Sequence, residues 1–196
     1  MDRLFVIGRD EVPARFEVLP GEALRLTFVK LPGLSVPVET EVLLAQCGCE
    51  VDVAGLYLCE GDDRFSLKLN LRHEAGECRS RQLFKGMASG NARALFDGRV
   101  YVAHGAQKTV ALQENHSLLL DAAASVESRP QLEIYADDVE CSHGATVGSL
   151  DAQQQFYMQS RGIPREEALR LQKISFLSPV LERLPESLVN EVVSRL

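Results

Sequence analysis

The sequence predicts a mainly β fold followed by a short C-terminal α-helical segment. From about residue 24 to residue 147, apolar and polar side chains alternate, most clearly over residues 65–72, which is typical of strands that bury one face. Single glycines and short polar breaks separate these runs, and no helical pattern of roughly 10–15 residues lies between them. After Ser149 the apolar residues change to helical spacing. We therefore divide the chain into a β body, residues 1–148, and a helical segment, residues 149–196.

Two all-β architectures fit the strand pattern. One is an antiparallel sandwich or barrel, and the other is a solenoid in which short strands stack coil upon coil. Two-residue hairpins depend on Asn-Gly or Asp-Gly, and Asp97-Gly98 is the only such dipeptide in the chain. This scarcity favours the solenoid, although the pattern alone leaves both architectures open. The alternating runs, in order, cover residues 24–28, 51–58, 65–72, 100–102 and 132–136.

Three short helices are expected in the C-terminal segment. Asp151, with Gln154 three residues later, predicts an N-cap and a partial capping box for a helix over residues 152–161, which ends at Gly162. A second helix begins at Pro164 and is expected to bend or stop at Pro179. A third begins at Pro185. Its apolar stripe either packs on the β body or forms a docking face for another protein; the stripe consists of Leu188, Val189, Val192, Val193 and Leu196.

The composition is that of a globular, cytoplasmic protein. The 196 residues include 45% hydrophobic and 25% charged residues, and 21 Lys and Arg against 28 Asp and Glu give a net charge of −7. An acidic chain disfavours nucleic-acid binding, which needs a basic face. No apolar run approaches the ~18 residues of a membrane-spanning helix, and the N-terminus lacks the apolar core of a signal peptide. We expect a cytoplasmic protein that binds neither nucleic acid nor membrane.

The five cysteines are expected to be reduced thiols, since their number is odd and their spacing is not that of a disulfide framework. Cys47 and Cys49 form an i, i+2 pair, which Cys59 and Cys78 could join only if the fold gathers them. Whether these four are more than core residues stays open. Phosphate-loop, esterase and zinc-protease motifs are absent from the sequence, so we do not expect an enzyme.

Cys141 and His143 are the candidate metal ligands. They lie in a polar, glycine-rich stretch near the end of the β body, and on a strand their side chains share one face. A thiolate and an imidazole can both bind iron or zinc, but together they supply only half of a tetrahedral shell. A second chain that meets this edge could supply the rest. The alternative is that Cys141 is buried and His143 bonds to a nearby carbonyl.

Several long stretches resemble the SufB/SufD family of iron–sulfur cluster assembly proteins, on its SufD side. The strongest are RPQLEIYADDVECSHGATVG at residues 129–148 and FYMQSRGI at residues 156–163, which is similar to the family's F-Y-L-x-S-R-G-I. Residues 94–100, 105–109 and 118–120 are similar as well. The resemblance implies a right-handed parallel β-helix followed by α-helices, in a scaffold subunit of the SUF system for iron–sulfur cluster assembly.

The resemblance also implies partners and a site. SufB-like and SufD-like subunits pair through their β-helices, and their C-terminal helices bind an ABC-type ATPase, SufC. The family's interface thiol and histidine map onto Cys141 and His143, so that iron or a nascent cluster would bind at a dimer interface. We expect the open strands around Cys141 to pair with another chain, and residues 151–196 to dock the ATPase.

Two departures from the family bear on this interpretation. SufB-like chains have His-Glu where this chain has His143-Gly144, and full-length relatives have an N-terminal helical region and a longer β-helix, so the chain is shortened at its N-terminus relative to them. A shortened β-helix could instead pair with itself. The competing hypothesis is thus a self-associating structural β-helix homodimer without cluster or metal chemistry.

Overall fold

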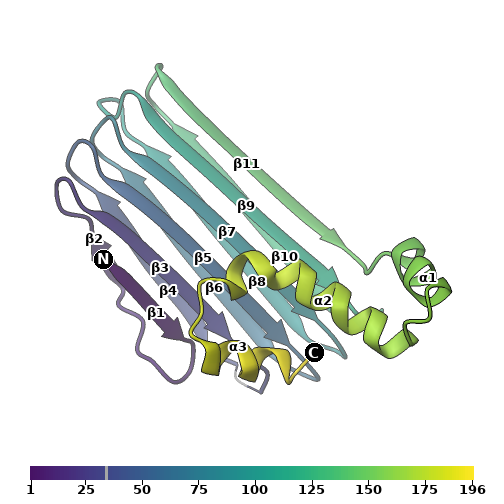
Figure 1. The fold of residues 1–196 in the computed structure, drawn as a ribbon. Coiled ribbons are helices and arrows are strands. Elements are labelled where there is room, and N and C mark those ends of the chain that lie inside the picture. The colour runs from purple at the N-terminus through teal and green to yellow at the C-terminus, as the bar shows by residue number, and fades with distance from the viewer. Residues whose placement is uncertain (34) are drawn as a thin grey trace.

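Eleven strands alternate between two sheets in the computed structural model, which describes residues 1–33 and 35–196 (Figure 1). The strands are β1 (Asp2–Val6), β2 (Arg15–Glu17), β3 (Ala23–Lys30), β4 (Pro37–Leu44), β5 (Glu50–Cys59), β6 (Arg64–His73), β7 (Arg79–Ala88), β8 (Arg93–Val102), β9 (Thr109–Leu119), β10 (Ser125–Ile134) and β11 (Val139–Gly148).

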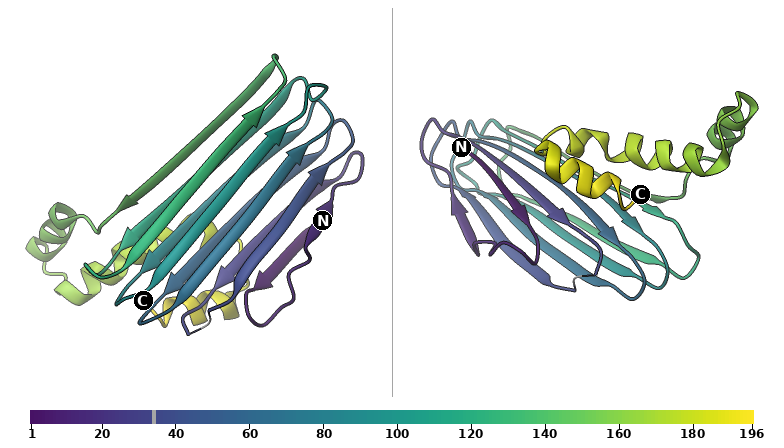
Figure 2. Two further views of the ribbon diagram at one scale, coloured as in Figure 1. Left: turned by 180° about the vertical axis from the view of Figure 1, so that it is seen from behind. Right: turned by 60° about the horizontal axis from the view of Figure 1, so that its bottom comes forward.

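Every described pair of neighbouring strands is parallel. The odd-numbered strands form a six-stranded sheet in the order β1-β3-β5-β7-β9-β11, and the even-numbered strands form a five-stranded sheet in the order β10-β8-β6-β4-β2. Each strand therefore crosses to the other sheet before the chain returns one coil further along. This is the parallel β-helix that the family resemblance implied, and the sandwich and barrel alternatives are wrong (Figure 2, left).

The core lies between the two sheets, because every strand turns alternate side chains inward. In β6 the inward residues Phe65, Leu67, Leu69 and Leu71 are all buried. Stacking makes this row continuous with the corresponding residues of neighbouring coils. The predicted period of two is thus confirmed as the face that each strand buries.

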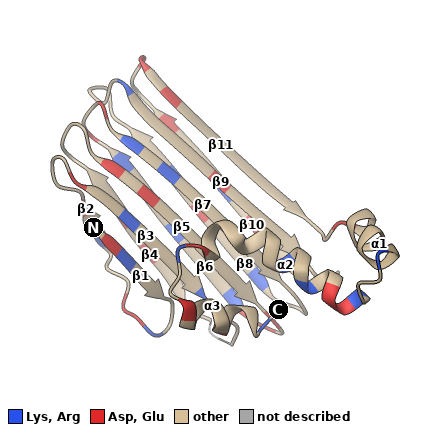
Figure 3. Ribbon diagram, viewed as in Figure 1, with Lys and Arg blue, Asp and Glu red and all other residues tan. Residues whose placement is uncertain are grey.

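Charged residues of both signs are spread along the strands (Figure 3). Several of them pair across neighbouring strands, including Lys68 with Glu39 at 2.7 Å and Arg99 with Glu133 at 3.3 Å. Exposed pairs of this kind contribute little to stability individually, typically about 0–1 kcal/mol. They keep the outer faces well solvated.

Three helices follow the strands: α1 (Ala152–Ser160), α2 (Arg165–Leu181) and α3 (Glu186–Val193). α2 and α3 lie against the six-stranded sheet, whereas α1 projects beyond its end (Figure 2, right). Leu188 and Val192 of the α3 stripe are buried against the sheet, in a cluster with Leu56 and Met87. The packing interpretation of that stripe is confirmed. None of the described helices has both the length and the apolar character that crossing a bilayer requires.

The helix boundaries follow the predicted signals, with one exception. The Asp151 carboxylate accepts hydrogen bonds from the backbone N–H groups of Gln153 at 2.7 Å and Gln154 at 3.1 Å, which confirms the N-cap. Gly162 ends α1 with a φ of 87°. The expected interruption at Pro179 is wrong, because α2 runs through this residue to Leu181.

A serine hydroxyl accounts for the continuity of α2 at Pro179. Proline has no N–H to donate to the carbonyl of Ser175 four residues earlier. The Ser178 hydroxyl donates to that carbonyl at 2.9 Å instead. The proline also lies in the last turn, so that little helix remains beyond it.

His73 should make the stability of the body depend on pH. Its side chain is buried, its Nε2 atom bonds to the Ser80 hydroxyl at 2.9 Å, and burial lowers its pKa to about 4. The unfolded chain binds this proton near its ordinary pKa of about 6.5, so stability is lost as pH falls from there through 4. Because the unfolded chain binds this proton more tightly, we expect the free energy of unfolding to fall by about 3 kcal/mol between pH 7 and pH 4. Urea unfolding of the wild type and of His73→Gln across this range tests the effect, since the variant should lack that part of the slope. Equal slopes would contradict it.

Candidate functional site

The last coil of the β-helix is open. Within the described residues, β10 pairs only with β8 and β11 only with β9, so each strand of ten residues leaves one backbone edge without a strand partner. Large apolar side chains are exposed here: 39% of Ile134, 49% of Tyr135 and 45% of Val147. An open edge with exposed apolar side chains is a typical surface for pairing with another chain.

Cys141 and His143 lie on this last coil, both on β11. They pair in register with Ala111 and Gln113 of β9, whose side chains are buried in the core. Cys141 and His143 therefore share the inward-facing side of β11. On the opposite side of the strand, the Thr146 hydroxyl bonds to His116 Nδ1 at 2.8 Å.

The two candidate ligands differ in their surroundings. Cys141 is half-buried against the apolar cluster of Val100, Val102 and Ala111, and burial raises the pKa of its thiol. His143 is exposed. The thiol therefore favours its protonated form at neutral pH. The alternative, a buried Cys141 with His143 bonded to a carbonyl, differs from the structure in that Cys141 is only half-buried.

Cys141 and His143 suit a metal site shared between two chains better than a site formed by this chain alone. Among the described residues, no group of three or more His, Cys, Asp or Glu side chains is arranged to hold a metal. A thiol and an imidazole two residues apart give a soft and a borderline ligand on one exposed strand, which suits iron or zinc. Because two ligands leave a tetrahedral shell half empty, further ligands would have to come from a chain that covers the last coil.

The other four cysteines lie away from this site. Cys59, at the end of β5, is a buried core residue, and burial raises its pKa to about 11. The fold gathers Cys47, Cys49 and Cys78 near the beginning of β5 and β7. The sequence could not show that grouping, because it depends on how the coils are stacked.

A buried ion pair, which sequence reasoning missed, joins two turns of the body. The Lys30 ammonium group bonds to the Asp63 carboxylate and donates to the Leu58 carbonyl at 3.0 Å. Asp63 also accepts from the backbone N–H groups of Gly33 at 3.2 Å and Glu60 at 3.1 Å. Burial opposes ionisation of Asp63, but these bonds outweigh it and hold the pKa of the carboxyl below its ordinary value. The pair is well satisfied, so we assign it a structural role.

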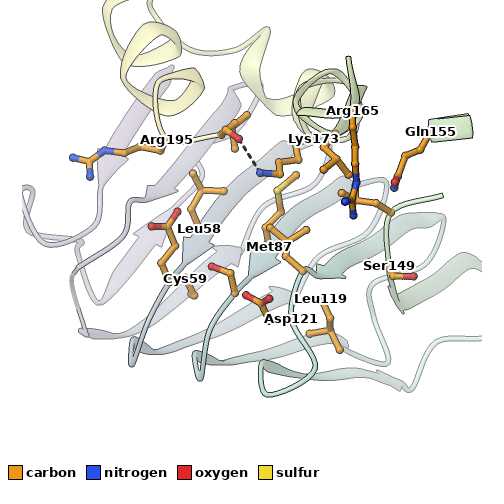
Figure 4. A pocket seen from close by; sticks show the side chains of 16 residues that line it. Leu58, Cys59, Met87, Leu119, Asp121, Ser149, Gln155, Arg165, Lys173 and Arg195 are labelled. Carbon is orange, nitrogen blue, oxygen red and sulfur yellow. Dashed lines mark hydrogen bonds between the residues drawn. The ribbon is translucent and has the colours of Figure 1, made fainter. Parts of the chain in front are cut away.

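A pocket lies where the helices meet the ends of β5, β7 and β9 (Figure 4). Leu58 and Met87 form part of its wall on the sheet, and Lys173 of α2 donates to the Leu196 carbonyl at 2.8 Å. The carboxylate of Asp121 is also part of the lining. Its described lining residues bring together no metal-binding group, and we treat it as the junction between the helices and the sheet.

Comparison with known proteins shows a consistent set of similarities. The family model described as "SUF system FeS cluster assembly, SufBD core domain" matches residues 17–176. The chain is 46% identical over 127 residues to the iron–sulfur cluster assembly protein SufD of Escherichia coli, which covers 64% of this chain. It is 42% identical over 137 residues, 68% of this chain, to the chloroplastic protein ABCI7 of Arabidopsis thaliana. A SufBD family iron–sulfur cluster assembly protein of Mycobacterium leprae is 30% identical over 176 residues, 86% of this chain.

These similarities cover only part of each relative. The matched regions amount to 30% of the Escherichia coli protein, 28% of the Arabidopsis protein and 45% of the Mycobacterium protein. The chain thus spans less than half the length of the curated relatives that it matches. The match includes the last coil, with Cys141 and His143, as well as α1.

Proposed function

The chain belongs to the SufBD family of SUF iron–sulfur cluster assembly proteins, and from this membership we propose that it acts as a SufD-like, non-enzymatic scaffold subunit. In this role it pairs through the open edges of β10 and β11 with a SufB-like subunit. Its C-terminal helices dock a SufC-like ATPase. Cys141 and His143 bind iron or a nascent cluster, which is cargo of the assembly rather than a resident cofactor.

The open last coil is the observation that carries this proposal. β10 and β11 each offer ten residues of backbone, so one partner strand on each edge would extend both sheets across an interface. Ile134 and Val147 would lose their exposure in such a complex. A partner that covers this coil would also cover Cys141 and His143.

The position of Cys141 and His143 supports their proposed cargo role. His143 is exposed and Cys141 is half-buried on the same side of the outermost strand, where only a second chain can complete a ligand shell. As the thiol loses its proton to bind iron, the thiolate and the neutral imidazole become two ligands at the interface. Shared ligation would allow the cluster to leave when the subunits move apart.

The exposed aromatic side chains of α1 support the docking of an ATPase. α1 has no buried residue, and Phe156 and Tyr157 are 74% and 59% exposed. Two adjacent exposed aromatic residues on a projecting helix are typical of a protein contact surface. The stripe of α3 is unsuited to this role, because it already packs on the sheet.

A double substitution tests the site within the assembled complex. The Cys141→Ala/His143→Ala variant, co-purified anaerobically with SufB-like and SufC-like partners, is expected to carry several-fold less iron and acid-labile sulfide than the wild-type complex. The exposed thiol Cys47, which lies away from the last coil, provides the matched control Cys47→Ala. If iron and sulfide in the double variant equal those of the wild type, Cys141 and His143 are not cargo ligands.

The homodimer hypothesis gives a different outcome in the same preparation. A self-associating β-helix would elute as two copies of this chain without SufB-like protein. Its iron and sulfide content would not respond to the double substitution. Mass measurement during size-exclusion chromatography distinguishes the two compositions.

A further inference from the structure

Three cysteines gather at the turns that precede β5 and β7, far from the last coil in the chain. Cys49 immediately precedes β5, and Cys78 immediately precedes β7. Both side chains are completely buried, at 0% exposed, and both belong to the main core cluster. Cys47, two residues before Cys49, is exposed.

The register of the sheet places Cys49 and Cys78 opposite each other in successive coils. β5 and β7 are parallel and their ladder begins with Glu50 opposite Arg79, so the preceding residues also face each other. The Arg79 N–H donates to the Cys49 carbonyl at 2.9 Å, which continues the ladder to this point. Neighbouring strands lie about 4.8 Å apart, a separation within the usual Cα–Cα range of disulfide-bonded cysteines.

The Cys78 thiol is oriented toward the coil of Cys49, whereas the Cys49 thiol lies 3.6 Å from the carbonyls of Val18 and Leu19 in the coil before it. The Cys78 thiol donates to the carbonyl of Gln46 at 3.2 Å, in the turn that leads to Cys49. The N–H group of Gly48, between Cys47 and Cys49, donates to the Gly76 carbonyl at 3.3 Å, so the two turns that carry the cysteines contact each other. The three cysteines therefore lie at two adjoining turns.

We propose that Cys49 and Cys78 are a redox modification site, which forms a reversible disulfide between successive coils, and that the exposed Cys47 reacts first. The co-reactant is a small-molecule disulfide of the glutathione class. This site is independent of the cluster cargo and of the partners proposed above.

The reaction balances in three exchange steps. The Cys47 thiolate attacks the small disulfide, so that a mixed disulfide forms and one small thiolate leaves. The Cys78 thiolate then attacks the Cys47 sulfur and releases the second small thiolate, and the Cys49 thiolate attacks the Cys78 sulfur and frees Cys47. Cys49 and Cys78 lose two electrons in total, the small disulfide gains them, and the protons of the two thiols pass to the released small thiolates.

Exposure determines the order of these steps. Burial raises the pKa of both Cys49 and Cys78, so neither is the thiolate that meets a reagent in solution. Cys47 is exposed and can react directly. Cys59 is buried at the far end of β5, outside this group of three, so it should stay reduced under the same treatment.

Peptide mapping after oxidation tests the site in the wild-type chain. The protein is incubated with oxidised glutathione, its free thiols are blocked, and it is digested with trypsin without reduction. We expect the peptide of residues 73–79, which contains Cys78, to be linked to the peptide of residues 31–64, with two fewer free thiols per chain. Because the bond joins two coils, the unfolding temperature should rise by roughly 5–10 °C and return on reduction.

Four single variants identify the participants. Cys49→Ser and Cys78→Ser should each prevent the final bond, Cys47→Ser should slow its formation at least tenfold, and Cys59→Ser should leave the linkage and its rate unchanged. Because the peptide of residues 31–64 also contains Cys47 and Cys59, fragmentation of the linked peptides must show the blocking group on both of these thiols, and this wild-type result decides even if a buried variant fails to fold. The site is refuted if wild-type Cys78 remains a free thiol, or if oxidation stops at a glutathione adduct on Cys47.

Discussion

A Val147→Lys variant is expected to lose its SufB-like partner while the free chain keeps its stability. Val147 lies on the last strand and is 45% exposed, so a lysine there remains solvated in the free chain. In the proposed complex the same ammonium group would be buried without a counter-charge. The cost of about 3 kcal/mol or more corresponds to a dissociation constant at least ~100-fold higher. Titration of the labelled partner, with thermal unfolding of the free variant beside it, measures both quantities.

Leu112→Lys is the matched control for this prediction. Leu112 is an equally apolar side chain, 42% exposed, but it lies on β9, which is paired on both sides by β7 and β11. The same charge at this position should leave partner binding unchanged. If Val147→Lys binds as tightly as Leu112→Lys, the last coil is not the interface.

A Gly86→Ala variant should be the most damaging small substitution in the β body. A Cβ atom at Gly86 would lie only 1.9 Å from Cζ of the buried Tyr57 ring. The ring cannot move without losing the hydrogen bond of 2.6 Å between its hydroxyl and that of Ser117. Overpacking and the loss of this bond together should lower the free energy of unfolding by about 3 kcal/mol or more. Urea denaturation followed by circular dichroism measures this loss.

Gly148→Ala shows whether the effect comes from the contact rather than from glycine itself. Gly148 is also on a strand, but a Cβ atom there would meet nothing within 4 Å. Its replacement should change the free energy of unfolding by less than ~0.5 kcal/mol. Similar losses in the two variants would contradict the assignment of Tyr57 as the obstacle at Gly86.

The local residue pattern was sufficient to predict strands and helices, but it was not sufficient to predict how the strands are arranged. Alternation over β6 and the capping signal at Asp151 depend on residues close in sequence, and both predictions are confirmed. Parallel and antiparallel strands that bury one face show the same alternation, so the pattern alone could not choose the solenoid. The family resemblance supplied that choice. Pro179 does lack the N–H donor that a helix needs, but the Ser178 hydroxyl donates to the Ser175 carbonyl in its place, so the helix continues.

The same distinction applies to the sites. Cys141 and His143 were predicted to share a face from their spacing of two, and on β11 they do. The grouping of Cys47, Cys49 and Cys78 and the ion pair of Lys30 with Asp63 join residues from different coils. Their proximity depends on the length and register of each coil, which no local signal encodes.

The most direct test of the proposed function is co-purification of this chain with SufB-like and SufC-like proteins from the same source. The three proteins are co-expressed, a tag is placed on this chain alone, and the eluate is analysed by mass measurement during size-exclusion chromatography. If this chain is a scaffold subunit that pairs through its last coil and docks the ATPase through its helices, one complex that contains all three proteins is expected. Elution of this chain by itself, as a monomer or a homodimer with neither protein bound, would contradict the proposed function.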